Sequence, residues 1–97
     1  MQVVYRLAAG RDIAEARRWY DAKRLGLGRE FRQAVRVVES LVKAHPDSFP
    51  KVHHEARRVL LKRFPYALYY QQLDEDTVEI IGCLHTRRGP RALRDRG

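Results

Sequence analysis

The stretch from Arg57 to Arg88 constrains the fold most, because it holds three runs of β-forming residues separated by very short links. The first run, 57–64, alternates apolar and basic side chains, which is typical of a strand with one buried face. Pro65 then separates it from an aromatic run at 66–73, since proline cannot donate a hydrogen bond within a sheet. An acidic turn leads to the apolar run 78–84. Links this short do not permit a parallel crossover, so the pattern predicts three adjacent antiparallel strands.

Two helical patterns come before these strands. After a break in the pattern at 8–10, apolar residues recur at helical spacing from Arg11 to about Arg24. The segment 27–45 keeps an apolar stripe over about five turns and ends at Pro46, which disfavours helical geometry in the residue before it. A short link with two glycines joins the two segments. We therefore expect a helical hairpin whose apolar side needs a cover.

The remaining segments complete the expected order. Residues 2–7 predict a short strand beside the later three, residues 46–55 a loop, and residues 91–97 a basic tail of about one helical turn. We predict a single α+β domain over residues 1–97, with an N-terminal strand and a two-helix hairpin packed on one face of a four-stranded antiparallel sheet. The opposite sheet face is expected to be open and to carry cations.

The charge of the chain indicates what it binds. Twenty Lys and Arg against twelve Asp and Glu give a formal charge of +8, which favours nucleic acid or an acidic protein segment as a partner. The lone Cys83 cannot form an intramolecular disulfide and is expected to be a buried, unreactive thiol. Because the sequence also shows no signal peptide and no membrane span, we expect a cytoplasmic protein that does not bind membranes.

The order of elements and a set of short motifs resemble those of the RelE/ParE superfamily, bacterial toxins of type II toxin-antitoxin systems. The resemblance covers essentially the whole chain, and its later part is the basic strand, an aromatic strand entered through Phe-Pro-Tyr, and a strand that ends in a histidine with arginines after it. The residues that carry it are Ala8-Ala9, Trp19-Tyr20, 46–50, 57–66, Leu68-Tyr69-Tyr70, Val78-Glu79-Ile80-Ile81 and His85-Thr86-Arg87-Arg88.

This resemblance implies two possible activities. RelE-type members are metal-independent ribonucleases that cut messenger RNA in the ribosome, whereas ParE-type members share the fold, lack the cleavage chemistry and poison DNA gyrase. Both types are neutralised by a cognate antitoxin whose flexible segment wraps the toxin. The implied partners are thus an antitoxin together with DNA gyrase or, alternatively, the ribosome and its mRNA, and no cofactor is implied.

Candidate site residues lie at the ends of the predicted strands. In a ribonuclease His85 would transfer protons, because its reference pKa lies near neutrality, and arginines would stabilise the charged phosphorane. The catalytic candidates are Arg57, Arg63, His85 and Arg87, and the binding candidates are Arg58, Lys62, Tyr69, Arg88 and Arg91.

One departure from the family pattern decides between the two activities. RelE-type members generally carry an aromatic residue near the C-terminus, and here no aromatic follows Tyr70. We therefore predict a ParE-like gyrase inhibitor, with a ribosome-dependent endoribonuclease as the alternative and a non-toxic basic binding module as the third possibility.

Other clusters favour structural roles. His53 and His54 beside Glu55 would point to opposite faces of an extended chain, so we predict no metal site. Trp19 and Tyr20 are expected to pack the first helix on the sheet.

Overall fold

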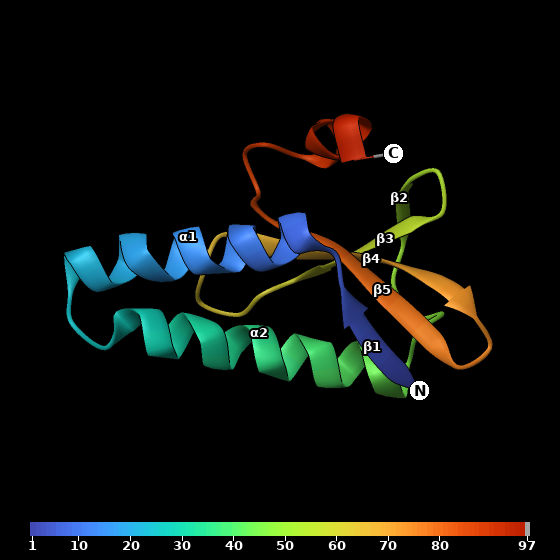
Figure 1. Cartoon of the computed structure of the whole chain (residues 1–97), viewed down its shortest axis with the longest axis horizontal. Coiled ribbons are helices and arrows are strands. Elements are labelled where there is room, and N and C mark those ends of the chain that lie inside the picture. Colours follow the sequence, from blue (N-terminus) through green and yellow to red (C-terminus); the bar gives the residue numbers. More distant parts are fainter. Residues whose placement is uncertain (97) are drawn as a thin grey trace.

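A computed structural model describes residues 1–96, without the side chain of Asp95, so Gly97 at the end of the predicted tail lies outside the described residues. Two helices pack beside a sheet and a short C-terminal helix lies across it (Figure 1), which confirms the predicted α+β class. The elements are β1 (Gln2–Tyr5), α1 (Leu7–Lys23), α2 (Leu27–Ala44), β2 (Lys51–His53), β3 (Ala56–Leu60), β4 (Tyr66–Asp74), β5 (Thr77–His85) and the 3-10 helix η1 (Pro90–Arg96).

The sheet differs from the prediction in strand number and direction. It has five strands in the order β1-β5-β4-β3-β2, and β1 runs parallel to β5, so the sheet is mixed rather than four-stranded and antiparallel. The predicted meander β3-β4-β5 is antiparallel as expected. The additional strand, β2, lies inside the predicted loop 46–55 and turns back at His54, whose φ is 51°. Three residues are too few to show a periodic pattern in the sequence.

Two predicted boundaries also move. Residues 8–10 do not break the helix: α1 begins at Leu7, and the backbone N–H of Gly10 donates to the carbonyl of Arg6. The two alanines before Gly10 favour helix enough to offset the glycine. The strand predicted at 57–64 ends at Leu60, because the chain turns through Arg63 with a φ of 71°.

The helical hairpin has the predicted position and a tight turn. Gly26 adopts a left-handed φ of 92° between the helices. The carboxylate of Asp21 then accepts a 2.8 Å hydrogen bond from the backbone N–H of Gly28. A Cβ at Gly28 would lie 2.6 Å from the carbonyl oxygen of Arg17, so only glycine allows the two helices to approach this closely.

The main core lies between the hairpin and the sheet and is rich in aromatic rings. Phe31 of α2 is fully buried and stacks on Tyr20 of α1 with ring centroids 5.5 Å apart. Phe64, in the β3–β4 connection, and Tyr66, the first residue of β4, meet Phe31 edge-on at 5.3 and 5.0 Å. Edge-on and offset contacts of this kind stabilise beyond the area that they bury.

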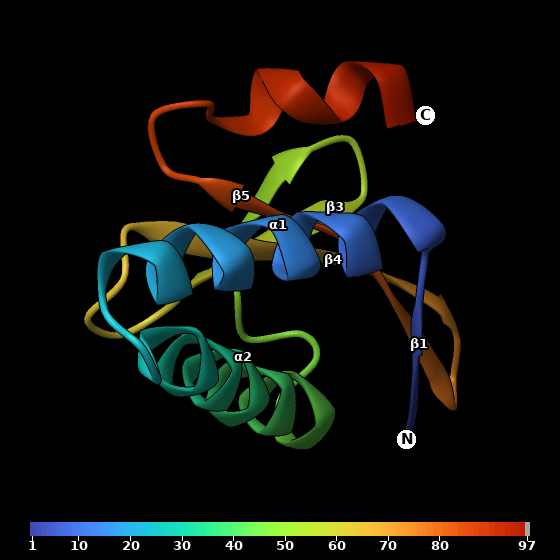
Figure 2. The same cartoon turned by 60° about the vertical axis from the view of Figure 1, so that its left-hand side comes forward.

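The second sheet face is not open as predicted, because η1 packs on it. Figures 1 and 2 show η1 on the side of the sheet that lies away from α2. Leu93 of η1 is 2% exposed and lies in a small core with Tyr69, Ile81 and Leu84. The predicted basic tail is thus a short helix, and it is anchored by an apolar residue that stands among arginines in the sequence.

β5 contributes side chains to both cores and contains a β-bulge. Tyr69 pairs with Gly82 and Tyr70 with Ile80, so Ile81 is the extra residue between them. Ile80 packs in the main core and Ile81 under η1, as neighbours in a strand do. The bulge shifts the alternation after Ile81, so that Cys83 faces the main core and Leu84 faces η1. Among residues 1–96, no helix is long and apolar enough to span a membrane.

Candidate functional site

Arg57, predicted as a catalytic candidate, is engaged inside the protein. It lies on β3, and its guanidinium donates to the carbonyl oxygens of Phe49 at 2.6 Å and Asp47 at 3.2 Å. The carboxylate of Asp47 lies 3.9 Å from the same group. Arg57 therefore holds the 46–50 loop against the sheet, the structural role that a half-buried arginine commonly has.

Arg63 is paired with a residue of α2. Its guanidinium donates to the carboxylate of Glu30 at 2.8 Å, and Arg24 adds a second contact at 3.2 Å. The hydrogen bond from Arg63 is the main reason that the pKa of Glu30 lies below its usual value. Arg63 thereby ties the β3–β4 connection to the start of α2.

The catalytic candidates Arg57 and His85 are not brought together. Arg57 is opposite Tyr70, whereas His85 is opposite Tyr66, four residues away on β4. At about 3.3 Å per strand residue this is a separation of about 13 Å along the strand, with β4 itself between the two groups. Arg57 and His85 therefore cannot act on the same phosphate without a rearrangement of the sheet.

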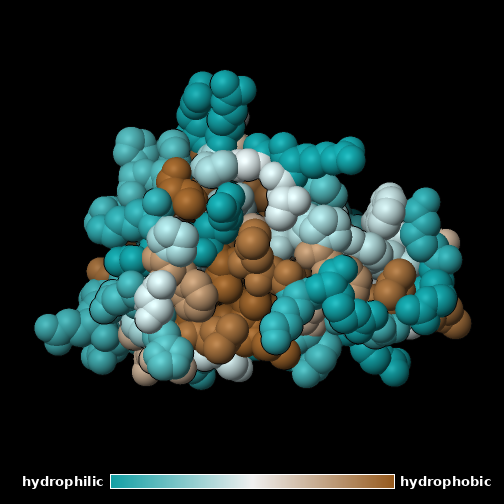
Figure 3. Space-filling view, turned by 180° about the vertical axis from the view of Figure 1, so that it is seen from behind, coloured by the Kyte–Doolittle hydropathy of each residue, from teal (hydrophilic) through white to brown (hydrophobic). Residues whose placement is uncertain are grey.

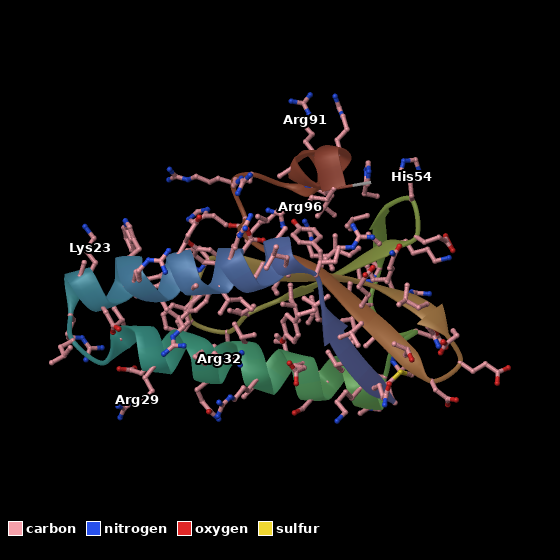
Figure 4. All side chains as sticks on the ribbon, in the orientation of Figure 1. Lys23, Arg29, Arg32, His54, Arg91 and Arg96 are labelled. Carbon is pink, nitrogen blue, oxygen red and sulfur yellow. The ribbon has the colours of Figure 1, made fainter. Side chains whose placement is uncertain are left out.

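The binding candidates occupy three different environments. Tyr69 is fully buried beneath η1, and its hydroxyl has no hydrogen-bond partner among the described residues. Arg58 lies beside Tyr69 on β3 and is half-buried, while Lys62 in the following connection is exposed. Arg91 lies on the outer side of η1 and points away from the protein (Figure 4).

His85 lines a cleft, which we call the α1 cleft, between α1 and the adjoining ends of β4 and β5. The cavity has a volume of about 470 Å³. The Nδ1 atom of His85 accepts a 3.1 Å hydrogen bond from the backbone N–H of Arg87, and its ring lies edge-on to Tyr66 at 5.3 Å. The lining residues that matter chemically are Glu15, Trp19, Tyr20, Tyr66, His85 and Arg88.

Of these six residues only His85 and Arg88 were among the predicted site residues, and the two from the exposed side of α1, Glu15 and Trp19, were missed. Trp19 was expected to pack on the sheet, but 54% of it is exposed, whereas Tyr20 is buried as predicted. Glu15 stands four residues before Trp19, which places both on one face of α1. That spacing is the only sequence feature that links Glu15 to Trp19. It does not show that the end of β5 lies opposite these two residues.

Beside the cleft, the C-terminal segment is fastened to α1 and β5 by what we call the Arg96–Asp12 clasp. The guanidinium of Arg96 makes two hydrogen bonds to the carboxylate of Asp12, at 2.5 and 2.9 Å, and a third to the carbonyl oxygen of Ile81 at 3.1 Å. The backbone N–H of Cys83 donates to the same carboxylate at 3.0 Å. A Cβ at Gly82 would lie 2.6 Å from the Arg96 guanidinium, so a larger residue there would displace that side chain from its present position.

Cys83 lies at the base of the cleft and is buried, as predicted. Burial, and secondarily the carboxylate of Asp12, raises the pKa of its thiol to about 12. Because the thiolate is the reactive form, Cys83 is poorly suited to act as a nucleophile.

The predicted geometry of the paired histidines is wrong. Because His54 turns with a positive φ, the rings of His53 and His54 lie 4.4 Å apart instead of on opposite faces of a strand. No group of three metal-binding side chains is found in the described part of the chain.

An apolar surface lies on another side of the molecule. Figure 3 shows a continuous apolar area bordered by hydrophilic residues on the face opposite to that of Figure 1. Among the exposed apolar residues, Val37 and Leu41 lie one turn apart on α2 and are 46% and 41% exposed, and Leu60 at the end of β3 is 56% exposed. An area of this kind is typical of a protein-binding surface.

One edge of the sheet also lacks a complete partner. The short strand β2 pairs only with Ala56 and Arg57 at the start of β3. The N–H of Arg58 donates to the carbonyl of Pro50, and beyond it no strand within residues 1–96 pairs with the outer edge of β3. An unpaired edge of this kind can accept a strand from another chain.

A comparison with solved structures identifies the fold. The chain is similar to a chain of the chromosomal ParDE TA system from P. aeruginosa, with a TM-score of 0.62 and 16% sequence identity over 88% of this chain and 95% of that chain. No protein-family model matches the sequence, and no curated protein matches it either. The likeness therefore establishes a fold shared with a component of that system.

Proposed function

We propose that this protein is the toxin of a type II toxin-antitoxin pair, that it is ParE-like, and that it inhibits DNA gyrase by binding rather than by cleaving RNA. The fold shared with a chain of a ParDE system supports the first part. The engagement of the arginines supports the second. Metal-independent RNA cleavage needs a base, an acid and fixed positive charge gathered around one phosphate.

The main observation behind this proposal is that two of the four catalytic candidates already bind groups within the protein. Arg57 donates to loop carbonyls, and Arg63 is paired with Glu30. His85, the last residue of β5, lies about 13 Å along the sheet from Arg57. This arrangement favours a binding protein over a ribonuclease.

A cognate antitoxin is part of the proposal. The exposed Val37 and Leu41 on α2 suit the apolar side of an amphipathic helix, and the unpaired edge of β3 suits an added strand. Acidic residues of the antitoxin would approach Arg58 and Arg87, since the chain carries a formal charge of +8.

Supercoiling of relaxed DNA by purified gyrase tests the target. Added protein should reduce supercoiling and accumulate cleaved DNA, and a preformed complex with the antitoxin should not. Unaffected gyrase, together with codon-linked cleavage of ribosome-bound RNA, would overturn the gyrase assignment in favour of the ribonuclease.

Charge reversal tests the antitoxin contact separately. The variants Arg58→Glu and Arg87→Glu should weaken the complex, mainly through slower association at low salt. Arg29→Glu is the matched control, because Arg29 is exposed on α2 and has no ion pair among the described residues. Equal effects of all three variants would show that only net charge matters.

A further inference from the structure

The α1 cleft presents aromatic surface that the fold does not use. Trp19 is 54% exposed although it is the largest apolar side chain on α1, and its indole is fixed edge-on against Tyr20 at 5.0 Å. Tyr66 and His85 supply aromatic surface from the strand ends. The volume of about 470 Å³ falls within the range of about 300–1,000 Å³ that is usual for small-molecule sites.

Charged groups of both signs line the same cleft and are not paired with each other. Arg88 and Glu15 have no ion pair within 4 Å among the described residues. Asp12, the other carboxylate at the cleft, is occupied by Arg96 and by the N–H of Cys83. Lys23 lies 4.7 Å over the ring of Trp19 and adds a second cation near the cleft.

This combination matches the groups of a nucleotide. An exposed indole and a tyrosine ring are stacking surfaces for a base, and arginine binds phosphate. A free carboxylate accepts hydrogen bonds from the amino groups of bases. A simple anion would leave the aromatic surface unused, and a cationic side chain would meet Arg88 and Lys23 in a chain of charge +8.

We infer that the α1 cleft binds one unstacked nucleotide of a single-stranded nucleic acid. The base lies against Trp19 and Tyr66, and its phosphate contacts Arg88. Glu15 accepts hydrogen bonds from the edge of the base. Guanine is the preferred base, because its N1–H and amino group offer a carboxylate two adjacent donors. The cleft does not include Val37 or Leu41, which are proposed to contact the antitoxin, so the inference does not depend on the proposed function.

The single tryptophan of the chain gives a direct measurement. Trp19 is the only tryptophan, so stacking of a base on it should quench all of the indole fluorescence. The probes are single-stranded DNA and RNA of about twelve nucleotides, and an abasic DNA of the same length and charge. We expect saturable quenching by the base-bearing strands. The abasic strand should bind about five- to 150-fold more weakly and should not quench.

Variants separate stacking from general charge attraction. In anisotropy titrations with labelled strands, Trp19→Ala and Arg88→Gln should weaken binding, whereas Arg29→Gln on the outer side of α2 should leave it nearly unchanged. Glu15→Gln should reduce the preference for guanine-containing strands and keep the stacking. The side chains changed at 19 and 88 are exposed, so circular dichroism should show folded variants.

Two results would overturn the inference. One is equal quenching and affinity for abasic and base-bearing strands. The other is equal weakening by Arg88→Gln and Arg29→Gln, which would indicate attraction by net charge alone. Both titrations use the isolated protein without gyrase or antitoxin, so their failure would leave the supercoiling result unaffected. The affinities measured for the DNA and the RNA strands show which of the two single-stranded nucleic acids the cleft binds.

Discussion

Removal of the arginine of the Arg96–Asp12 clasp should destabilise the whole domain. The side chain of Asp12 is 10% exposed, and three of its hydrogen bonds come from Arg96 and from the backbone of Cys83. The substitution Arg96→Gln removes the positive charge and leaves a partly buried carboxylate with one backbone donor. A carboxylate that loses its partner in this way keeps its desolvation penalty.

The magnitude follows from the burial of the pair. Removal of one partner of a buried ion pair costs about 3–5 kcal/mol. Arg96 is 18% exposed and Cys83 still donates to Asp12, so we expect about 2–3 kcal/mol, at or below the lower end of that range. For a domain of this size the midpoint of thermal unfolding should fall by on the order of 10–20 °C.

Urea and thermal unfolding followed by circular dichroism measure this effect. Arg94→Gln is the control, because it makes the same charge change in the same segment at an exposed position. The variant Asp12→Asn and the double variant complete a cycle whose coupling energy should be about 1–3 kcal/mol. Unfolding free energies of the Arg96 and Arg94 variants within about 0.5 kcal/mol of each other would refute the role of the clasp.

Two further predictions concern titratable groups. Burial raises the pKa of Cys83 to about 12, so a thiol reagent at about pH 8 should react only after unfolding. This thiol should also make stability fall as pH rises above its unfolded pKa of about 8.5, because only the unfolded chain then loses the proton. For Glu79, burial acts to raise the pKa, but hydrogen bonds from Arg6 and Gln71 outweigh it and lower the value. Arg6→Gln should therefore lower the urea midpoint at neutral pH, and the difference from the wild type should shrink as pH falls through the folded pKa of Glu79.

Elements with a strong local pattern were predictable from the sequence. The stripe of α2 predicted a helix over 27–45, and the helix spans Leu27–Ala44. The β-rich runs predicted at 66–73 and 78–84 form Tyr66–Asp74 and Thr77–His85. The apolar stripe of α2 faces the main core and the apolar runs of β4 and β5 fill both cores, so the local pattern and the tertiary packing agree.

Features that depend on distant contacts were not predictable. β1 runs parallel to β5, with Val3 paired to Val78. The identity of these two residues does not indicate the direction of the strands. Leu93 stands in a run of arginines, and its burial depends on the bulge at Ile81 and on the clasp. A charged tail with one apolar residue is as consistent with a solvated segment as with an anchored one.

The candidate site was predicted in part for the same reason. His85 and Arg88 were singled out because they follow a strand, and they do line the α1 cleft. Glu15 and Trp19 complete the cleft from α1, and their contribution depends on how that helix crosses the end of β5. The sequence shows which side chains a helical face and a strand end carry, but it does not show that the two lie close together in the fold.

The distribution of arginines explains why net charge alone is a poor guide to the binding surface. Arg57, Arg63 and Arg96 bind carbonyl or carboxylate groups of the chain itself, so their charge is largely used in holding the fold. Arg87 and Arg88 follow β5, are exposed, and have no ion pair among the described residues. An anionic ligand should therefore bind beside the α1 cleft, where the aromatic surface also lies.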